Sequence, residues 1–226
     1  MTYAFYGFVL GFMIPYMARR FAKFMPASAA ESVWRLLYSG KRTSHQRRFT
    51  SLKYKRLVST YFWRCFMFGL LVAGLFYYAS YHFSIRGLSG ILAFIWALVL
   101  LLEIDYKTMF LPDVVTVPLL IGGFVFSSFY GEWVFSTESA LGAVVGYLLP
   151  VIAALFIVKK HPDAFGGGDI KLLAAIGAWV GILAVIYTIL IATILFVFFA
   201  LITRRRVGAF GPAISIAGII VAFYFF

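Results

Sequence analysis

The side chains in this sequence that could perform bond-breaking chemistry are carboxylates, and they are few. The chain has eight Asp and Glu residues among its 226 residues. Two carboxylates that share one proton can hydrolyse an amide, one acting as a base toward water and the other as an acid. Five of the acids gather around two segments of the chain and are the candidates for such a pair: Glu103, Asp105, Asp113, Asp163 and Asp169.

The first segment, residues 97–120, contains three of these acids. Asp105 falls at the C-terminal end of an expected apolar helix, where the helix dipole disfavours an anion, so no capping role explains it. Asp113 begins the next expected helix and has a structural explanation as its N-cap, because a carboxylate there accepts an orphan backbone N–H. Glu103 lies two residues before Asp105 and does not share its helix face. Asp105 is therefore the stronger catalytic candidate of this segment.

The second segment, residues 161–181, runs three consecutive glycines into Asp169 and an apolar helix. Gly166, Gly167 and Gly168 permit positive φ and close backbone approach, which suits a loop that receives an extended substrate strand. A phosphate-binding loop fits less well, because Asp169 places an anion at the helix start and no Gly-Lys-Ser/Thr follows. Two readings remain open: Asp169 is a catalytic carboxylate, or it only caps the helix.

The elements that position these acids are predicted to be membrane-spanning helices. The chain is 63% hydrophobic and 12% charged, with a mean hydropathy of +0.96, which is too apolar for a soluble domain. Closed helices of about 20 residues are the usual way to satisfy the backbone inside a bilayer. We expect an all-α, polytopic helical bundle built from the apolar stretches at residues 3–17, 65–85, 87–104, 114–131, 139–158, 172–203 and 207–226.

The stretch 172–203 is too long for one straight span, since its length as a single helix would be about 48 Å. A break near Gly181 gives eight transmembrane helices with the N-terminus outside. Cytoplasmic loops collect Lys and Arg, and this arrangement places all but Arg86 of the 20 basic residues on the inner side. The inner loops are then 18–64, 105–113, 159–171 and 204–206, so Asp105 and Asp169 lie on the same membrane face.

The net charge of +12 comes mainly from the predicted basic loop, residues 18–64. Attraction to anionic lipid headgroups and membrane topology account for it, and no nucleic-acid-binding motif accompanies the charge. Membrane lipids are therefore expected partners, and nucleic acid is not. Cys65 is the one cysteine, which predicts no disulfide and no cysteine-based metal site.

Two motifs around these aspartates resemble those of type IV prepilin peptidases, which are GxGD-class intramembrane aspartyl proteases. The family's first motif, Ile-Asp followed by Leu-Pro-Asp and Thr-x-Pro-Leu-Leu, is matched by Ile104-Asp105, residues 111–113 and residues 116–120. The second, Gly-Gly-Gly-Asp-x-Lys-Leu followed by Gly-Ala-Trp, is matched by residues 166–172 and 177–179. A weaker third match is Phe210-Gly211-Pro212.

The resemblance implies a membrane-embedded aspartyl endopeptidase of the bacterial cytoplasmic (inner) membrane. Its implied substrates are type IV prepilins or pseudopilins, cut at the cytoplasmic face between the leader peptide and the hydrophobic helix. The family's catalytic aspartates fall at Asp105 and Asp169. Asp113, Lys171 and the glycines Gly166, Gly167 and Gly168 match family positions as supporting residues.

The family also implies N-methylation of the new N-terminus with S-adenosylmethionine, whereas proteolysis needs no cofactor. Many members carry two Cys-x-x-Cys pairs in the loop after the first span. The loop 18–64 has none, so we expect no metal site there, and methyl transfer stays open. We accordingly divide the chain into residues 1–64, a first helix with a basic loop, and residues 65–226, the peptidase core.

Two other functions also fit the composition. A small multi-span transporter could use Asp105 and Asp169 to relay protons or bind a cation, since ionisable residues in membrane helices often do so. Such a protein would have broken helices with carboxylates near the middle of the membrane. A non-catalytic assembly factor would instead use the basic loop as a docking surface.

Overall fold

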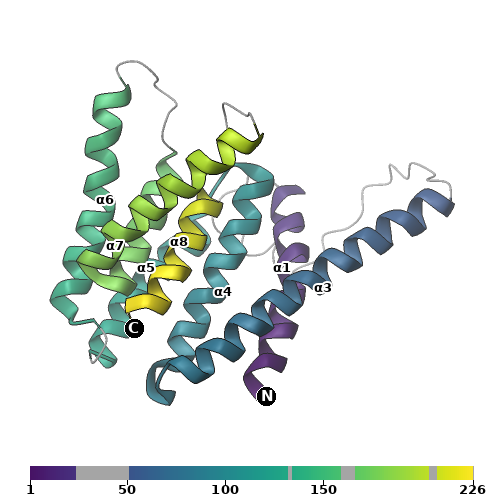
Figure 1. Cartoon of the computed structure of the whole chain (residues 1–226), viewed down its shortest axis with the longest axis horizontal. Helices are drawn as coiled ribbons and strands as arrows, with labels where there is room; N and C mark the ends of the chain where they lie inside the picture. Colours follow the sequence, from purple (N-terminus) through teal and green to yellow (C-terminus); the bar gives the residue numbers. More distant parts are fainter. Residues whose placement is uncertain (24–50, 132–133, 159–165, 204–207, 226) are drawn as a thin grey trace. The chain divides into compact units, whose positions relative to one another are not determined.

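The chain folds into α-helices, and no strand occurs in the parts that the structure describes (Figure 1). The computed structural model describes residues 1–23, 51–131, 134–158, 166–203 and 208–225. The all-α prediction is therefore confirmed for these residues. The helices are α1 (Thr2–Lys23), α3 (Ser51–His82), α4 (Ile85–Thr108), α5 (Asp113–Phe129), α6 (Ser136–Val158), α7 (Gly167–Thr203) and α8 (Gly211–Phe225).

These helices form two compact units, Met1–Tyr78 and Ala79–Phe226, which divide within α3. In the first unit α1 packs closely on α3. The helices approach so closely that a side chain at Gly11 would collide with the Phe68 carbonyl. The predicted division at residues 64 and 65 separated an accessory segment from a catalytic one, and it stays a prediction. Most of the basic loop lies outside the described residues, as do residues 159–165 and 204–207.

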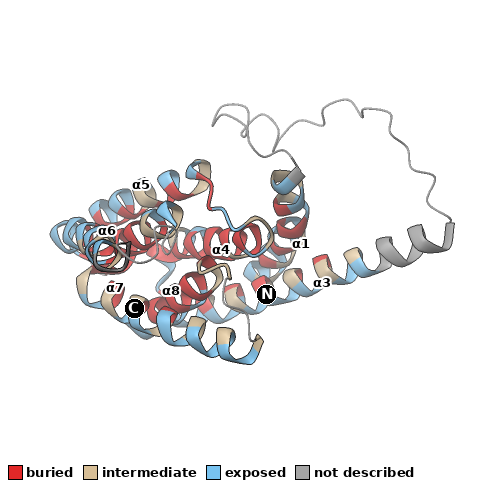
Figure 2. Cartoon of the chain, turned by 90° about the horizontal axis from the view of Figure 1, so that it is seen from above, coloured by how far each residue is buried: buried red, intermediate tan, exposed pale blue. Residues whose placement is uncertain are grey.

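The second unit is held together by α7, which packs against α5, α6 and α8. Trp179 of α7 stacks between Phe94 of α4 and Phe126 of α5, with ring centroids 5.0 Å away on each side. Its indole N–H donates to the Leu119 carbonyl at 2.7 Å, so the one polar atom of this ring is satisfied inside the core. Burial is concentrated on α4, α8 and the first half of α7, as Figure 2 shows.

Helix α7 is broken at Gly181, whose φ of 81° and ψ of −176° are not helical. Only glycine adopts this conformation at little cost. The break frees the Ala178 carbonyl from its helical partner, and the buried Ser139 hydroxyl of α6 donates to it at 2.6 Å. The expected break near Gly181 is therefore confirmed, and the described residues contain eight helical segments when α7 is counted as two.

The outward surface of the second half of α7 is an apolar stripe at helical spacing. Soluble proteins rarely expose a continuous apolar surface of this kind to water. The stripe consists of Leu183, Tyr187, Leu190, Ile194, Phe198 and Leu201. By length and composition, four helices of the described part could cross a membrane: Thr60–His82, Ile85–Thr108, Ser136–Leu155 and Gly167–Thr203. The apolar helices α5 and α8 are shorter. Eight spans and an external N-terminus remain predictions.

Candidate active site

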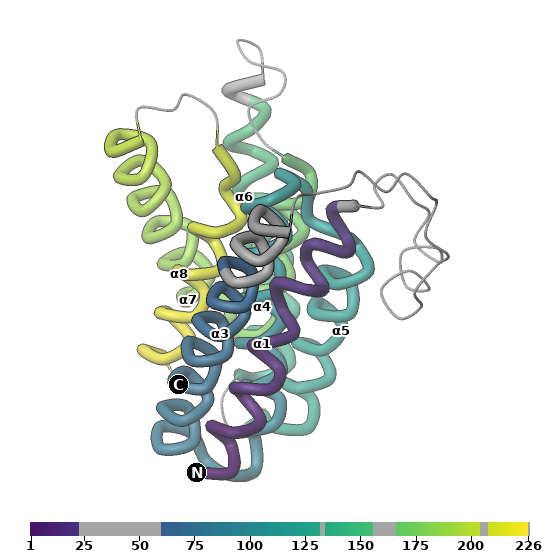
Figure 3. The backbone as a smooth tube through the Cα atoms, turned by 90° about the vertical axis from the view of Figure 1, so that its right-hand side faces the viewer, coloured from purple at the N-terminus to yellow at the C-terminus, as the bar shows by residue number. Residues whose placement is uncertain are grey.

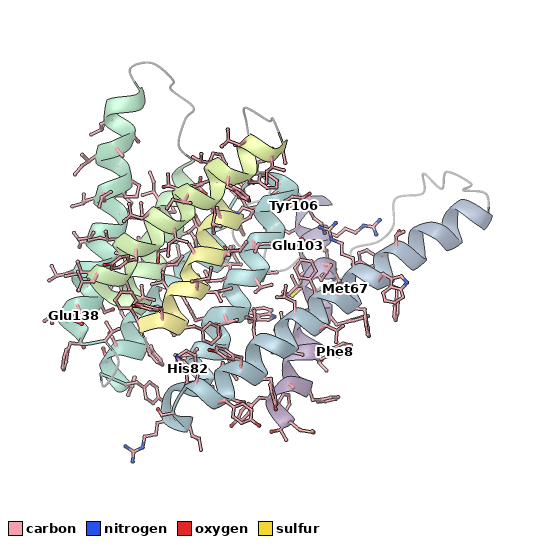
Figure 4. The ribbon with its side chains drawn as sticks, in the orientation of Figure 1. Phe8, Met67, His82, Glu103, Tyr106 and Glu138 are labelled. Carbon is pink, nitrogen blue, oxygen red and sulfur yellow. The ribbon has the colours of Figure 1, made fainter. Side chains whose placement is uncertain are left out.

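Four helix ends meet at one end of the second unit, and they carry the residues that the sequence singled out. Helix α4 ends there, and α5, α7 and α8 begin there (Figures 1 and 3). The break in α7 lies at the other end. Figure 4 labels Tyr106, which follows Asp105, and Glu138, whose side chain lies beside Gly181, at opposite ends of this unit. The site is therefore built from short segments that are distant in sequence.

Asp105 is buried at the C-terminal end of α4, with 4% of its surface exposed. Its Oδ2 accepts a hydrogen bond from the Gly211 N–H at the start of α8, at 2.9 Å. The α4 helix ends at Thr108, and its C-cap Met109, which has a left-handed φ of 51°, donates its N–H to the Asp105 carbonyl at 2.8 Å. Both the backbone and the carboxylate of Asp105 are thereby fixed.

Asp169 lies in the first turn of α7, half-buried, and is tied to the glycine run before it. Its N–H donates to the Gly166 carbonyl at 3.0 Å, and its carboxylate accepts the Gly166 N–H. This reciprocal pair resembles a capping box, in which a side chain in the first turn reaches back to the N-cap N–H. Asp169 therefore stabilises the start of α7. This contact leaves part of its carboxylate available for a catalytic role.

The carboxyl groups of Asp105 and Asp169 are close enough to interact electrostatically. Asp105 comes from the end of α4 and Asp169 from the start of α7, so only the tertiary fold brings them together. Each accepts a backbone N–H from the beginning of a helix, where the dipole favours an anion. In general, two carboxyls that approach each other closely do not both ionise readily and can share one proton, which is the property that an aspartyl protease uses.

Asp113 and Lys171 form an ion pair beside these two residues. The Lys171 ammonium donates to both Asp113 oxygens, at 2.7 and 2.8 Å, and joins the first turn of α5 to that of α7. The N-cap of α5 is Pro112, so the hypothesis that Asp113 caps this helix is wrong. The Asp113 carboxylate instead pairs with the Lys171 ammonium of α7, which lies within hydrogen-bonding distance.

Of the glycines before Asp169, Gly168 allows a close approach between segments. A side chain at Gly168 would come within 2.9 Å of the Leu111 Cβ, so its absence lets the start of α7 pack on the connection between α4 and α5. Gly167 faces open space. Positive φ is not used here, since Gly181 is the glycine of the described segments that adopts it.

Glu103 belongs to a different environment from Asp105. It is 1% exposed and pairs with Lys107 one turn along α4, at 2.7 Å, whereas the Asp105 carboxylate accepts the Gly211 N–H. The described segments contain no group of three or more His, Cys, Asp or Glu residues that could hold a metal ion. Asp163 lies outside the described residues.

Gly211 was not among the site residues predicted from the sequence, although it donates directly to Asp105. The available signal was the weak Phe210-Gly211-Pro212 match at the start of the last apolar stretch. Glycine followed by proline is a common way to begin a helix, so the pattern alone gave no reason to place it beside Asp105.

Residues 92–201, which include Asp105, Asp113, Asp169 and Lys171, match the type IV leader peptidase family. The chain therefore carries a domain of this family. It is 37% identical over 128 residues to a prepilin leader peptidase/N-methyltransferase of Neisseria gonorrhoeae, covering 55% of this chain and 44% of the relative. It is 35% identical over 161 residues to the protein of that name from Pectobacterium carotovorum subsp. carotovorum, covering 68% and 56%.

A protein of the same name from Dickeya chrysanthemi is 39% identical over 128 residues, covering 53% of this chain and 45% of the relative. The chain thus spans about half the length of these curated relatives. No solved structure matches it.

Proposed function

We propose that this protein is a membrane-embedded aspartyl endopeptidase that removes the leader peptide of type IV prepilins or pseudopilins. The observation that carries the proposal is that Asp105 and Asp169 come from the end of α4 and the start of α7, at one end of the unit, and that each carboxylate accepts a backbone N–H there. The relatives are named prepilin leader peptidases, which supports the substrate class. The family match covers the segment that contains both residues.

The proposed chemistry uses one ionised and one protonated carboxyl group. The ionised group takes a proton from water as the water oxygen attacks the scissile carbonyl carbon, and the protonated group gives its proton to the carbonyl oxygen. As the C–N bond breaks, the carboxyl that took the proton from water gives it to the amine nitrogen, and the other carboxylate takes a proton from a hydroxyl of the tetrahedral intermediate to leave a carboxylic acid product. The proton that the pair shares is restored, so proteolysis requires no cofactor.

The position of the pair at helix ends fits cleavage at the membrane surface. A prepilin leader would end just before a hydrophobic helix, so its junction would lie at the level of these helix ends, and the charge pattern predicts that this face is cytoplasmic. A transporter with a mid-membrane carboxylate site fits less well. The break in α7 at Gly181 is about 18 Å along the helix from Asp169, too far to build a site around it.

The direct test is cleavage of a prepilin by membranes that contain the full chain, followed by the size of the product on a gel and its N-terminal sequence. Release of the mature pilin with a new N-terminus at the leader junction supports the proposal. Intact prepilin after prolonged incubation, with the enzyme correctly inserted, contradicts it. Proton or cation flux into sealed vesicles would instead favour the transporter.

Methylation of the new N-terminus is a second candidate activity, supported by the name that the relatives carry. S-adenosylmethionine would be the methyl donor. The curated relatives are about twice as long as the aligned segment, and the family match lies within residues 92–201. Transfer of a radiolabelled methyl group to cleaved pilin would test this activity separately from proteolysis.

The topology prediction can be checked by the accessibility of single cysteines, with Cys65 first replaced by serine. Lys107→Cys and Arg205→Cys should react only from the cytoplasmic side, and Arg86→Cys and Phe135→Cys only from outside. Position 205 lies outside the described residues, so the labelling is independent of the structure. An external position 205 would mean that residues 172–203 cross once, and the eight-span arrangement would be wrong.

The Asp113–Lys171 ion pair is expected to support the site without dominating stability. Both side chains are about half exposed, at 55% and 46%, and an exposed pair contributes about 0–1 kcal/mol. We expect Lys171→Gln to lower the rate of leader cleavage by about 10-fold, because the first turn of α7 that carries Asp169 loses its link to α5. The rate is measured on a purified prepilin.

The exchanged pair, Asp113→Lys with Lys171→Asp, is the control. It keeps the link between the helices with the charges reversed and should recover part of the lost activity. If Lys171→Gln cuts as fast as the unmodified enzyme, the pair has no positioning role.

A further inference from the structure

The first turn of α8 supplies a hydrogen-bond donor to a carboxylate that the dipole of α4 disfavours. Asp105 is buried at the C-terminal end of α4, where the helix field opposes a negative charge. A buried carboxylate needs hydrogen-bond donors. The donor to Asp105 is the backbone N–H of Gly211, at 2.9 Å, on a helix that follows more than a hundred residues later in the chain.

The backbone of α8 leaves this one donor free for Asp105. The first N–H groups of a helix have no partner within the helix. The N–H groups of Ala213 and Ile214 donate to the Phe210 carbonyl, at 3.0 and 3.1 Å, and Pro212 has no N–H. Gly211 therefore carries the orphan donor of the first turn, and it points at the carboxylate.

Glycine is also required at this position for space. A Cβ on Gly211 would lie 2.6 Å from the Asp105 Oδ2, 2.9 Å from its Cγ and 3.0 Å from its Cβ. The three nearest atoms all belong to the Asp105 side chain, so a larger residue would displace that carboxylate first. Gly218 on the same helix differs, because the atoms nearest to a Cβ there would be the flexible side-chain ends of Ile176 and Leu98, at 3.0 and 3.3 Å.

We propose that Gly211 is the positioning residue for Asp105, and that the first turn of α8 is a third structural component of the active site beside α4 and α7. Its N–H directs the Asp105 carboxylate, and its missing side chain leaves the space in which that carboxylate lies. The effect on cleavage rests on the proposed peptidase function. The geometric coupling between Gly211 and Asp105 does not.

The first test is kinetic and compares Gly211→Ala with the control Gly218→Ala in the full chain. We expect Gly211→Ala to lower kcat by about 100-fold and to leave KM within about threefold, because substrate still binds while the carboxylate is misplaced. Gly218→Ala should retain most of the activity. Wild-type kcat in Gly211→Ala, or an equal loss in both variants, would overturn the proposal.

The second test measures thermal stability and needs no substrate. Gly211→Ala should lower Tm by about 5 °C through its collision with Asp105, and most of that loss should disappear in an Asp105→Ala background. Gly218→Ala should change Tm equally in both backgrounds. If Gly211→Ala alone does not fold and the double variant does, the coupling is supported; an unrelieved loss overturns it. If the wild-type protein cleaves no prepilin but Asp105→Ala still relieves the Tm loss of Gly211→Ala, only the peptidase proposal is refuted.

Discussion

Replacing either Asp105 or Asp169 with asparagine is expected to lower leader cleavage by at least about 1,000-fold. Asparagine keeps the size of the side chain and its hydrogen-bonding capacity, including acceptance from the Gly211 or Gly166 N–H, but it cannot hold or pass the proton. Because the proposed mechanism uses the two carboxyls as a unit, combining both substitutions should lower the rate little further than either one. The measurement is the initial rate of prepilin cleavage at equal amounts of inserted enzyme.

Glu138→Gln is the matched control for this experiment. Glu138 is an acid of the same unit, but it lies beside Gly181 at the end away from the aspartate pair (Figure 4). We expect near-normal cleavage from this variant. Near-normal cleavage by either asparagine variant would end the assignment of Asp105 and Asp169 as the catalytic pair.

The second large effect is expected where α6 crosses the first half of α7. A Cβ on Gly177 would collide with the backbone carbonyl of Gly142, and a Cβ on Gly142 would collide with that of Gly177. Neither obstacle is a flexible side chain, so the helices themselves must move apart. We expect Gly177→Ala to destabilise the protein by more than about 3 kcal/mol, beyond the usual ~1–3 kcal/mol of overpacking in a core.

Thermal unfolding in detergent, followed by circular dichroism, measures this loss. Gly74→Ala on α3 is the control, because a Cβ there meets nothing within 4 Å, and alanine is the better helix former. We expect Gly74→Ala to leave Tm unchanged or raise it slightly. A Gly177→Ala protein as stable as the unmodified one would show that α6 and α7 are not packed backbone to backbone.

Much of the fold could be predicted from local sequence because the bilayer imposes simple rules. Apolar runs of sufficient length become helices when no water is present to satisfy the backbone. The break at Gly181 was also predictable, since residues 172–203 are too long for one span and contain a residue that tolerates φ of 81°.

The candidate site residues could be chosen from the sequence, but the contacts that surround them in the fold could not. Residue types and order singled out Asp105 and Asp169, because carboxylates are rare in a chain that is 63% hydrophobic and each needs a reason to be there. Which atoms stabilise them depends on contacts between segments that are distant in sequence. The turn of Asp113 toward Lys171 and away from capping α5 is one such contact, and the Gly211 N–H on Asp105 is another. Local patterns determine which residues enter helices, but only tertiary packing decides which helix ends meet.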